Sequence, residues 1–318
     1  MLVSVIVPLK NAQDYVACAL TSILSEKDTP LEVVVVNDRC TDASLDRVRE
    51  IEDERMRVVD APGRGISACL NVGLVEAQGD IIMRCDADDL YPPGRIKEQV
   101  SWLRSHPDID AVCGGFSMID AHGSVVTELR FGDDEAEITD ELAHGTVRTH
   151  LCTYAVRSSL IGSVGGFREY FETAEDIDFQ LRMGEMGRIT CVPENWYHYR
   201  IHASSITHTQ RTSLRAYFKE YACELQRQRR AGKRDALQMG QAPCNSDDAM
   251  ALDKPLSADD HIQGLLLGRA WQEHRTGQKT RALRTGLRAL MVNPRRKAVW
   301  KSVGSLAIKP ARNIGAEF

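Results

Sequence analysis

Three carboxylates stand within four positions in the stretch IIMRCDADDLYPPGR, residues 81–95. The apolar run before them is short, which is typical of a buried strand, so Asp86, Asp88 and Asp89 follow the end of that strand. Carboxylates at such distances raise one another's pKa unless a cation intervenes. Hard divalent ions prefer oxygen ligands and are commonly completed by water and phosphate. The cluster therefore predicts a site for Mn²⁺ or Mg²⁺ with a phosphate-bearing ligand, and helix capping is the structural alternative.

Three other motifs with similar residues can be compared with this stretch. A calcium-binding EF-hand loop that starts at Asp86 requires Gly and Glu where this sequence has Tyr91 and Lys97, so it is excluded. An aspartyl-phosphate phosphatase has Thr or Val where Leu90 stands and places its motif after the first strand, so it remains only as a rival. A dinucleotide-binding fold requires a Gly-rich turn after the first strand, and residues 8–15 contain no glycine.

The elements that must position these carboxylates are strands and helices in alternation. Four near-continuous apolar runs have the length of strands: 2–8, 31–37, 55–60 and 80–86. The segments between them have helical spacing, which predicts an α/β fold with a mostly parallel sheet covered by helices on both faces. Ligands of such sheets bind at the carboxyl ends of the strands. The polar residues that follow three of the runs, at 8–11, 37–42 and 86–89, are therefore expected at one edge.

Composition limits the class of protein. The chain has 318 residues, 43% hydrophobic and 27% charged, and a net charge of -5, which argues against a nucleic-acid-binding protein. Its nine cysteines are spaced singly, without any C-x-x-C pair, which argues against a disulfide framework and a zinc site. The sequence shows no leader peptide and no run of about 18 apolar residues. We expect a cytoplasmic protein with one domain over 1–210 and a helical extension over 211–318.

The C-terminal part is strongly basic. Residues 269–312 contain twelve Lys or Arg and one acid, Glu273. Helical spacing places four apolar residues on one face, Leu283, Leu287, Leu290 and Met291, and three arginines on another, Arg281, Arg284 and Arg288. A basic amphipathic helix of this kind predicts peripheral contact with an anionic membrane, on the inner face of the plasma membrane. The alternative is a helix that packs its apolar face on the domain.

Five blocks of sequence occur in an order that resembles a known family. The blocks are SVIVPLKNAQDYVACALTSIL (4–24), EVVVVNDRCTD (32–42), GRGISACLNVGLVEAQGDIIMRCDADDLYPPGR (63–95), GGFREYFETAEDIDFQLRM (165–183) and YRIHASSIT (199–207). Together they resemble the family 2 glycosyltransferases of bacterial surface-polysaccharide type. The resemblance implies a GT-A, Rossmann-like fold and an inverting, metal-dependent transfer of a sugar. The donor would be a nucleotide-diphosphate sugar and the acceptor a glycan or a lipid-linked molecule.

The resemblance also implies roles for particular residues. Residues expected to bind the nucleotide donor are Pro8, Asn11, Asp38, Gly65, Asn71, Arg84 and Asp86. The D-x-D aspartates Asp86 and Asp88 would hold the metal, with His202 completing its ligands. Each has a structural alternative. It is turn or N-cap chemistry for Pro8, Asn11 and Asp38, and a structural histidine for His202. For Gly65 it is a turn, for Asn71 the anchoring of backbone, and for Arg84 neutralisation of the aspartates. Lys10 and Asn37 depart from the family's usual residues at their positions.

Inverting transfer requires a base that takes the proton of the acceptor hydroxyl. The resemblance assigns that role to Asp176 in AEDID, with Glu175 beside it. Glu175 and Asp178 are neighbours of Asp176, but adjacent positions of a helix diverge by about 100°, so only one of these acids should point at the acceptor. Favourable interaction with the helix dipole is the alternative reason for these acids. His150 and Arg182 are expected on the acceptor side or in packing. A noncatalytic nucleotide-sugar-binding scaffold and the phosphatase are the competing functions.

Overall fold

The structure is a computed structural model that describes residues 1–205, 212–243 and 256–309. The chain divides into two compact units. One comprises Met1–Phe116, Leu129–Tyr199 and Ser213–Leu252, and the other comprises Ser117–Glu128, Arg200–Thr212 and Asp253–Phe318. This division differs from the predicted ranges, because most of helix α9 (Thr212–Arg230) groups with the first unit and a segment from mid-chain groups with the second.

A mixed sheet forms the centre of the fold, in the order β3-β2-β1-β4-β8-β5-β9-β7, with β6 paired to β5. Its first four strands are β1 (Val3–Leu9), β2 (Leu31–Asn37), β3 (Met56–Asp60) and β4 (Ile81–Arg84), and their pairings are parallel. The other strands are β5 (Ala111–Ile119), β6 (Val125–Leu129), β7 (Ala136–Glu137), β8 (Ala155–Arg157) and β9 (Ile189–Arg200). β8 pairs antiparallel with β4 and β5, and β7 with β9. All four predicted strands are confirmed, and the α/β class with them.

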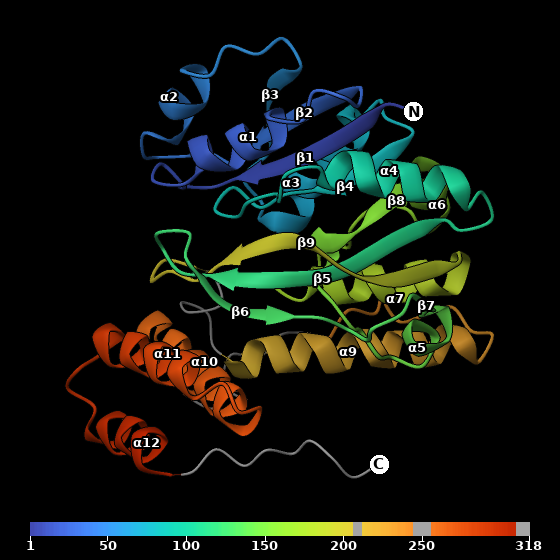
Figure 1. Cartoon of the computed structure of the whole chain (residues 1–318). Helices are drawn as coiled ribbons and strands as arrows, with labels where there is room; N and C mark the ends of the chain where they lie inside the picture. Colours follow the sequence, from blue (N-terminus) through green and yellow to red (C-terminus); the bar gives the residue numbers. More distant parts are fainter. Residues whose placement is uncertain (206–211, 244–255, 310–318) are drawn as a thin grey trace. The chain divides into compact units, whose positions relative to one another are not determined.

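Helices cover both faces of this sheet (Figure 1). Those of the first unit are α1 (Val16–Leu24), α2 (Ser44–Arg49), α3 (Ile66–Glu76), α4 (Arg95–Ser105), α5 (Thr139–Ala143), α6 (Ser158–Val164) and α7 (Glu175–Met186), with the 3₁₀ turn η1 (Leu151–Thr153). A single core cluster joins Ile6 of β1 to Leu70 of α3 and Phe179 of α7. Each such buried apolar side chain contributes roughly 1.5–3 kcal/mol relative to exposure. This packing fixes the start of α7 beside the parallel strands.

The second unit contains α10 (Ala258–Arg275), α11 (Lys279–Val292) and α12 (Lys297–Ile308). The side chain of Ser257 caps α10 by accepting from the backbone N–H of Asp260 (3.1 Å). The sequence also predicts a linker at 231–257, where the helical pattern is lost, and this stretch lies partly outside the described residues. None of the helices described is long and apolar enough to cross a membrane.

The predicted apolar face of α11 is wrong in part. Leu290 is buried with Ala282 and Ala289, whereas Leu287 and Met291 are exposed. Small residues set this orientation, because a Cβ added to Gly286 would lie 3.2 Å from Val303 and Leu306 of α12. The spacing of large apolar residues alone does not show which face of a helix carries side chains small enough for close packing against a neighbouring helix.

Candidate functional site

Unusual backbone conformations occur at the predicted site. Within the described residues, three non-glycine residues have positive φ: Asn11 (49°), Arg39 (56°) and Ala174 (59°). Asn11 follows β1, Arg39 follows β2, and Ala174 directly precedes α7. A left-handed conformation costs a non-glycine residue free energy, and such residues concentrate at functional sites. The three segments with predicted donor or acceptor roles are therefore the ones that hold this strain.

Asp38 lies in the turn after β2 and is 7% exposed. Its Oδ2 pairs with Lys10 Nζ at 3.3 Å, and Lys10 Nζ also donates to the Asp38 carbonyl oxygen (2.6 Å). Asp38 Oδ1 is buried and accepts no hydrogen bond. A buried oxygen without a donor is costly, so a ligand N–H at this point would be stabilising.

Two further predicted residues complete this turn. The Asn11 side-chain oxygen accepts from the backbone N–H of Thr41 (2.8 Å), which ties the turn after β1 to the turn after β2. Pro8 is buried within β1 and pairs with Val36 of β2. Asn11 thus holds the two turns together through a backbone contact.

Gly65 and Asn71 lie at the start of α3 and in its middle. Gly65 is the N-cap with φ of 92°, a conformation that favours glycine. Asn71 donates to the Phe167 carbonyl (2.8 Å) and accepts from the Phe167 N–H (2.7 Å). Since both ends of its amide bind this backbone, Asn71 anchors the segment that leads into α7.

The three clustered aspartates have different surroundings. Asp86 Oδ1 accepts from Arg84 Nε (2.7 Å), and the Cys152 thiol lies 3.6 Å from Asp86 Oδ2. Asp89 is buried and accepts from the Tyr197 hydroxyl (2.6 Å), whose oxygen accepts from the Asp86 N–H (3.1 Å). Asp86 and Asp88 are partly exposed. Asp89 therefore supports the loop, and the other two carboxylates can reach a ligand.

Arg84 joins this cluster to the start of α7. Its Nη1 lies 3.1 Å from Glu175 Oε1, while its Nε contacts Asp86. Burial raises the pKa of Glu175, the neighbouring charge of Asp176 raises it further, and Arg84 opposes both effects. One guanidinium thus bridges the carboxylates of Asp86 and Glu175, and it lies 91 residues before Glu175 in the sequence.

The acids of α7 fall into two classes. Asp178 is fully buried, and its Oδ2 accepts from Arg182 Nε (2.9 Å) while its Oδ1 lies 3.6 Å from Arg168 Nη1. The Asp176 side chain is 14% exposed and lies 3.9 Å from Arg215 Nη2 of α9. Asp178 is therefore committed to an internal ion pair, and Asp176 is the acid with access to a ligand. Arg182 serves packing in this network.

The two predicted histidines lie in different units. His150 stacks on the ring of Tyr199, with centroids 5.1 Å apart. Burial lowers the pKa of His150, while the charges of Asp176 and Asp86 raise it, so the imidazole is within electrostatic reach of both acids. His202 belongs to the second unit, where its Nδ1 contacts the Ser204 hydroxyl (2.9 Å).

The described residues contain no group of three His, Cys, Asp or Glu that could hold a metal ion alone. Asp86 and Asp88 nevertheless fit a divalent ion, because both offer carboxylate oxygens at the partly exposed end of a strand. Such a pair suits Mg²⁺ or Mn²⁺ when phosphate and water supply the remaining ligands. The protein would thus supply part of the ligand set of the ion, and phosphate and water would supply the rest.

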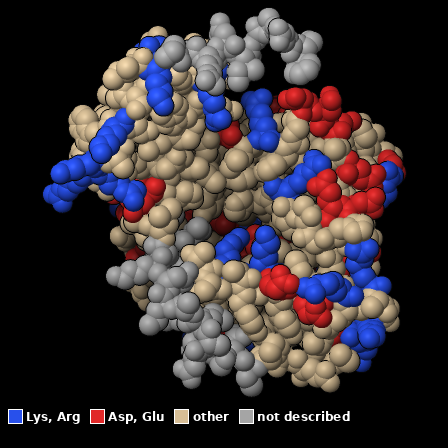
Figure 2. All heavy atoms as spheres, turned by 90° about the horizontal axis from the view of Figure 1, so that it is seen from below, with Lys and Arg blue, Asp and Glu red and all other residues tan. Residues whose placement is uncertain are grey.

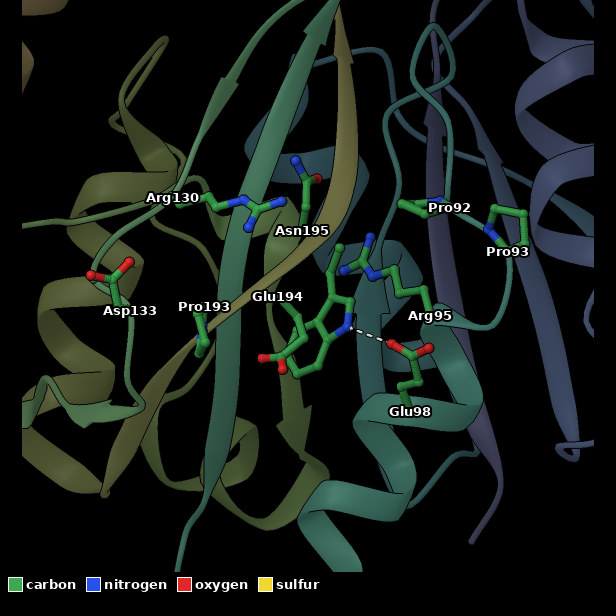
Figure 3. Close-up of a pocket in the computed structure, with 11 residues that line it drawn as sticks. Pro92, Pro93, Arg95, Glu98, Arg130, Asp133, Pro193, Glu194 and Asn195 are labelled. Carbon is green, nitrogen blue, oxygen red and sulfur yellow. Dashed lines mark hydrogen bonds between the residues drawn. The ribbon is translucent and has the colours of Figure 1, made fainter. Parts of the chain in front are cut away.

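A hollow of about 500 Å³ lies beside β9 and the start of α4 (Figure 3). Its lining includes Arg95, Arg130, Asp133 and Trp196, and none of the predicted site residues. Trp196 donates to Glu98 (3.0 Å), and successive side chains of a strand face opposite sides, so Trp196 and Tyr197 diverge. This hollow is distinct from the aspartate cluster.

Sequence reasoning missed two side chains of the site. Tyr197 holds the aspartate loop, and Cys152 lies against Asp86. The alternating aromatics of WYHYR (196–200) were the available signal for Tyr197, since one face of that strand must point inward. Nothing in the local sequence distinguishes Cys152 from the other cysteines.

Comparisons with known proteins indicate the family of the chain. The model of the family described as "Glycosyl transferase family 2" matches residues 4–160. The protein described as "Putative glycosyltransferase EpsE" of Bacillus subtilis is 31% identical over 191 residues, which cover 58% of this chain and 67% of that protein. The uncharacterized glycosyltransferase RP339 of Rickettsia prowazekii is 27% identical over 68% of this chain and 69% of its own.

The fold is also found in a solved structure. The S. aureus TarS fragment 1–349 in complex with UDP-GlcNAc superposes with a TM-score of 0.59 at 19% identity, covering 96% of this chain and 87% of that one. At this identity the likeness concerns the fold alone.

Proposed function

We propose, because the chain belongs to glycosyltransferase family 2, that it is a metal-dependent inverting hexosyltransferase of polysaccharide biosynthesis. It would move a sugar from a nucleotide-diphosphate sugar to a hydroxyl of a glycan or lipid-linked acceptor. The observation that carries this proposal is the Arg84 bridge, at 2.7 Å to Asp86 and 3.1 Å to Glu175. It brings the aspartates suited to a diphosphate beside the acids suited to an acceptor.

Binding of the donor involves the turns after β1 and β2. Asp38 Oδ1, buried and without a donor, would accept an N–H of the nucleobase. Lys10 holds the other oxygen at 3.3 Å and so orients the carboxylate. Gly65 leaves open space where a Cβ would stand, since no atom lies within 4 Å of that position, and the donor would use this space. The TarS complex with UDP-GlcNAc supports a nucleotide sugar as donor.

Asp88 and Asp86 would hold Mn²⁺ or Mg²⁺ against the diphosphate. When bound, the ion supplies Lewis-acid stabilisation of the departing diphosphate. Arg84, already beside Asp86, carries a positive charge that the leaving group would also attract.

Asp176 is proposed as the general base. The acceptor hydroxyl oxygen forms a bond to the anomeric carbon from the face opposite the diphosphate, and the bond from that carbon to the diphosphate oxygen breaks. The hydroxyl proton passes to the Asp176 carboxylate, so charge and atoms balance. Arg215 Nη2 of α9 lies 3.9 Å from the Asp176 carboxylate and would help to orient it.

We place this reaction in the cytoplasm, with peripheral contact between the basic tail and the inner face of the plasma membrane. That location suits a lipid-linked acceptor, whose glycan is presented at a membrane surface. We do not propose a nucleic-acid partner, because the net charge of -5 is unfavourable for a polyanion.

Calorimetric titration with nucleotide diphosphates and sugar nucleotides, with Mn²⁺ and then with chelator, tests this function. We expect one nucleotide to bind in a metal-dependent manner, and Asp88→Asn to abolish the effect of the metal. Asp176→Asn should keep donor binding and lose transfer. Donor binding without turnover on any glycan or lipid-linked acceptor would instead indicate a noncatalytic scaffold, and absence of binding across the panel would reject the proposal.

A further inference from the structure

The outer faces of α11 and α12 expose large apolar side chains. The exposed fractions are 56% for Leu287, 82% for Met291, 56% for Trp300 and 84% for Ile308. Within the second unit both helices use their other faces for packing, through Ala282, Ala289 and Leu290 of α11 and Val299, Val303 and Leu306 of α12. The exposed residues therefore do not contribute to the packing of this unit.

Cations share these outer faces. At about 100° per residue, Arg284, Leu287 and Met291 fall within about 60° of arc on α11. Lys297, Trp300, Lys301 and Ile308 fall within about 100° on α12. Each helix thus presents apolar and basic side chains on the same side, as helices that lie in a lipid interface do.

The sequence around these faces contains no negative charge. Residues 276–309 include nine Lys or Arg and no Asp or Glu. Arg281, Arg288 and Arg296 reach acids elsewhere in the unit, at 3.1 Å to Glu273, 3.9 Å to Asp120 and 2.9 Å to Asp260. In the described part of the chain, Arg284, Lys297 and Lys301 have no acidic partner and are exposed. These cations remain available to an external anion.

We propose that the second unit docks on an anionic phospholipid surface through Arg284, Leu287 and Met291 of α11 and Lys297, Trp300, Lys301 and Ile308 of α12. This surface replaces the apolar face predicted from the sequence, which included the buried Leu290. It makes the membrane contact of the proposed function specific, and it rests on the proposal that the acceptor is lipid-linked. Figure 2 shows Lys and Arg side chains projecting from a largely uncharged surface at the left of the view.

A lipid surface fits these residues better than other occupants. A second copy that met this surface with its own α11 and α12 would oppose the same cations without acids to pair with them, since residues 276–309 contain none. Nucleic acid would attract the cations but would leave Met291 and Ile308 in water. Trp300 donates its ring N–H to the Pro294 carbonyl (2.8 Å), so its indole can enter an apolar layer without an unpaired donor.

Sedimentation of the full chain with lipid vesicles tests the proposal. We expect binding to vesicles of phosphatidylcholine with phosphatidylglycerol, and none to phosphatidylcholine alone. Lys297→Ala with Lys301→Ala should weaken binding about 30-fold, since each cation near such a surface contributes about 1 kcal/mol. Met291→Gln with Ile308→Gln should weaken it about tenfold, and neither pair should unfold the protein, because all four side chains are exposed.

Matched controls lie in the first unit. Lys27→Ala with Arg104→Ala, and Val75→Gln with Met186→Gln, change exposed residues of the same kinds and should leave vesicle binding unchanged. Binding that survives both test pairs, or its absence on anionic vesicles, would overturn the proposal. Equal binding to duplex DNA, with no effect of Met291→Gln and Ile308→Gln, would indicate a polyanion site instead. Asp88→Asn should bind vesicles normally, so failure of the transferase proposal is seen separately.

Discussion

Asp178→Asn is predicted to destabilise the protein, whereas Asp176→Asn, two residues away, is predicted to affect transfer. Asp178 is fully buried between Arg182, at 2.9 Å, and Arg168, at 3.6 Å. The asparagine has nearly the same shape but no charge, so both guanidinium groups lose their anion inside the protein. Arg168 keeps a second partner, Asp235 at 2.7 Å, and Arg182 keeps two carbonyl oxygens.

The magnitude follows from the burial of the pair. Breaking a buried ion pair costs about 3–5 kcal/mol, because the remaining charge has lost the solvation of water. The surviving contacts of Arg168 and Arg182 place Asp178→Asn at the lower end, at about 3 kcal/mol. For a domain of this size each kcal/mol lowers the melting temperature by about 2–4 °C, so we expect a decrease of roughly 6–12 °C.

Thermal and urea unfolding of both variants, followed by circular dichroism, measures this difference. The Asp176 side chain is 14% exposed and has one distant cation at 3.9 Å, so Asp176→Asn should change stability by less than about 1 kcal/mol. It should lower the transfer rate by about 10²–10⁴-fold. Equal stability of the wild type and Asp178→Asn, or equal losses of stability in the two variants, would refute the assignment of separate roles.

Three further predictions concern the donor turn and the titrating groups. Asp38→Ala should weaken nucleotide binding by about 1–3 kcal/mol in calorimetry, because the base loses its acceptor. Asp46→Ala changes an exposed acid of α2, so it is the control and should bind normally. Arg84→Met should raise the pKa of Glu175 further above its ordinary value, because the opposing positive charge is lost. The free energy of unfolding, measured by urea titration, should then fall more steeply than in wild type as pH rises from about 5 to about 8. An equal dependence on pH in the two proteins would contradict the role of the bridge. Burial lowers the pKa of His150, so the stability that its neutral form provides is present above about pH 6.5 and lost as pH falls below that value. In His150→Gln the free energy of unfolding should therefore decrease less over this range. The same decrease in the variant and the wild type would refute the prediction.

The parallel half of the fold could be predicted closely from the sequence. Strands buried on both faces are continuous apolar runs, so β1 and β2 were found to within one residue of their observed bounds. β8, with three residues, and β7, with two, are too short to give a pattern. The outward face of α11 was not predictable, since it depends on the closeness of α12 at Gly286.

The residues of the site could be named from sequence, but their division of labour could not. The sequence does not distinguish Asp86, Asp88 and Asp89 from one another. Only the fold places Tyr197 where its hydroxyl binds Asp89. Asp178 differs from Asp176 through its partners Arg168 and Arg182. Arg182 stands four residues further on in the same helix, a spacing that the sequence shows, whereas Arg168 lies outside this helix and only the fold brings it to Asp178. Side-chain direction and distant partners such as Arg168 and Tyr197 decide these roles, and local spacing does not encode them.

The Arg84 bridge makes donor affinity and proton affinity mutually dependent. Arg84 can neutralise Glu175 or follow the diphosphate, and a ligand that draws it away leaves Glu175 with a higher pKa beside Asp176. Donor binding should then be accompanied by proton uptake, and by reciprocity a lower pH should tighten donor binding. Such a site would couple occupancy of the proposed donor position to the proposed acceptor side through the charge of one side chain. The order in which the two substrates enter would be imposed by charge.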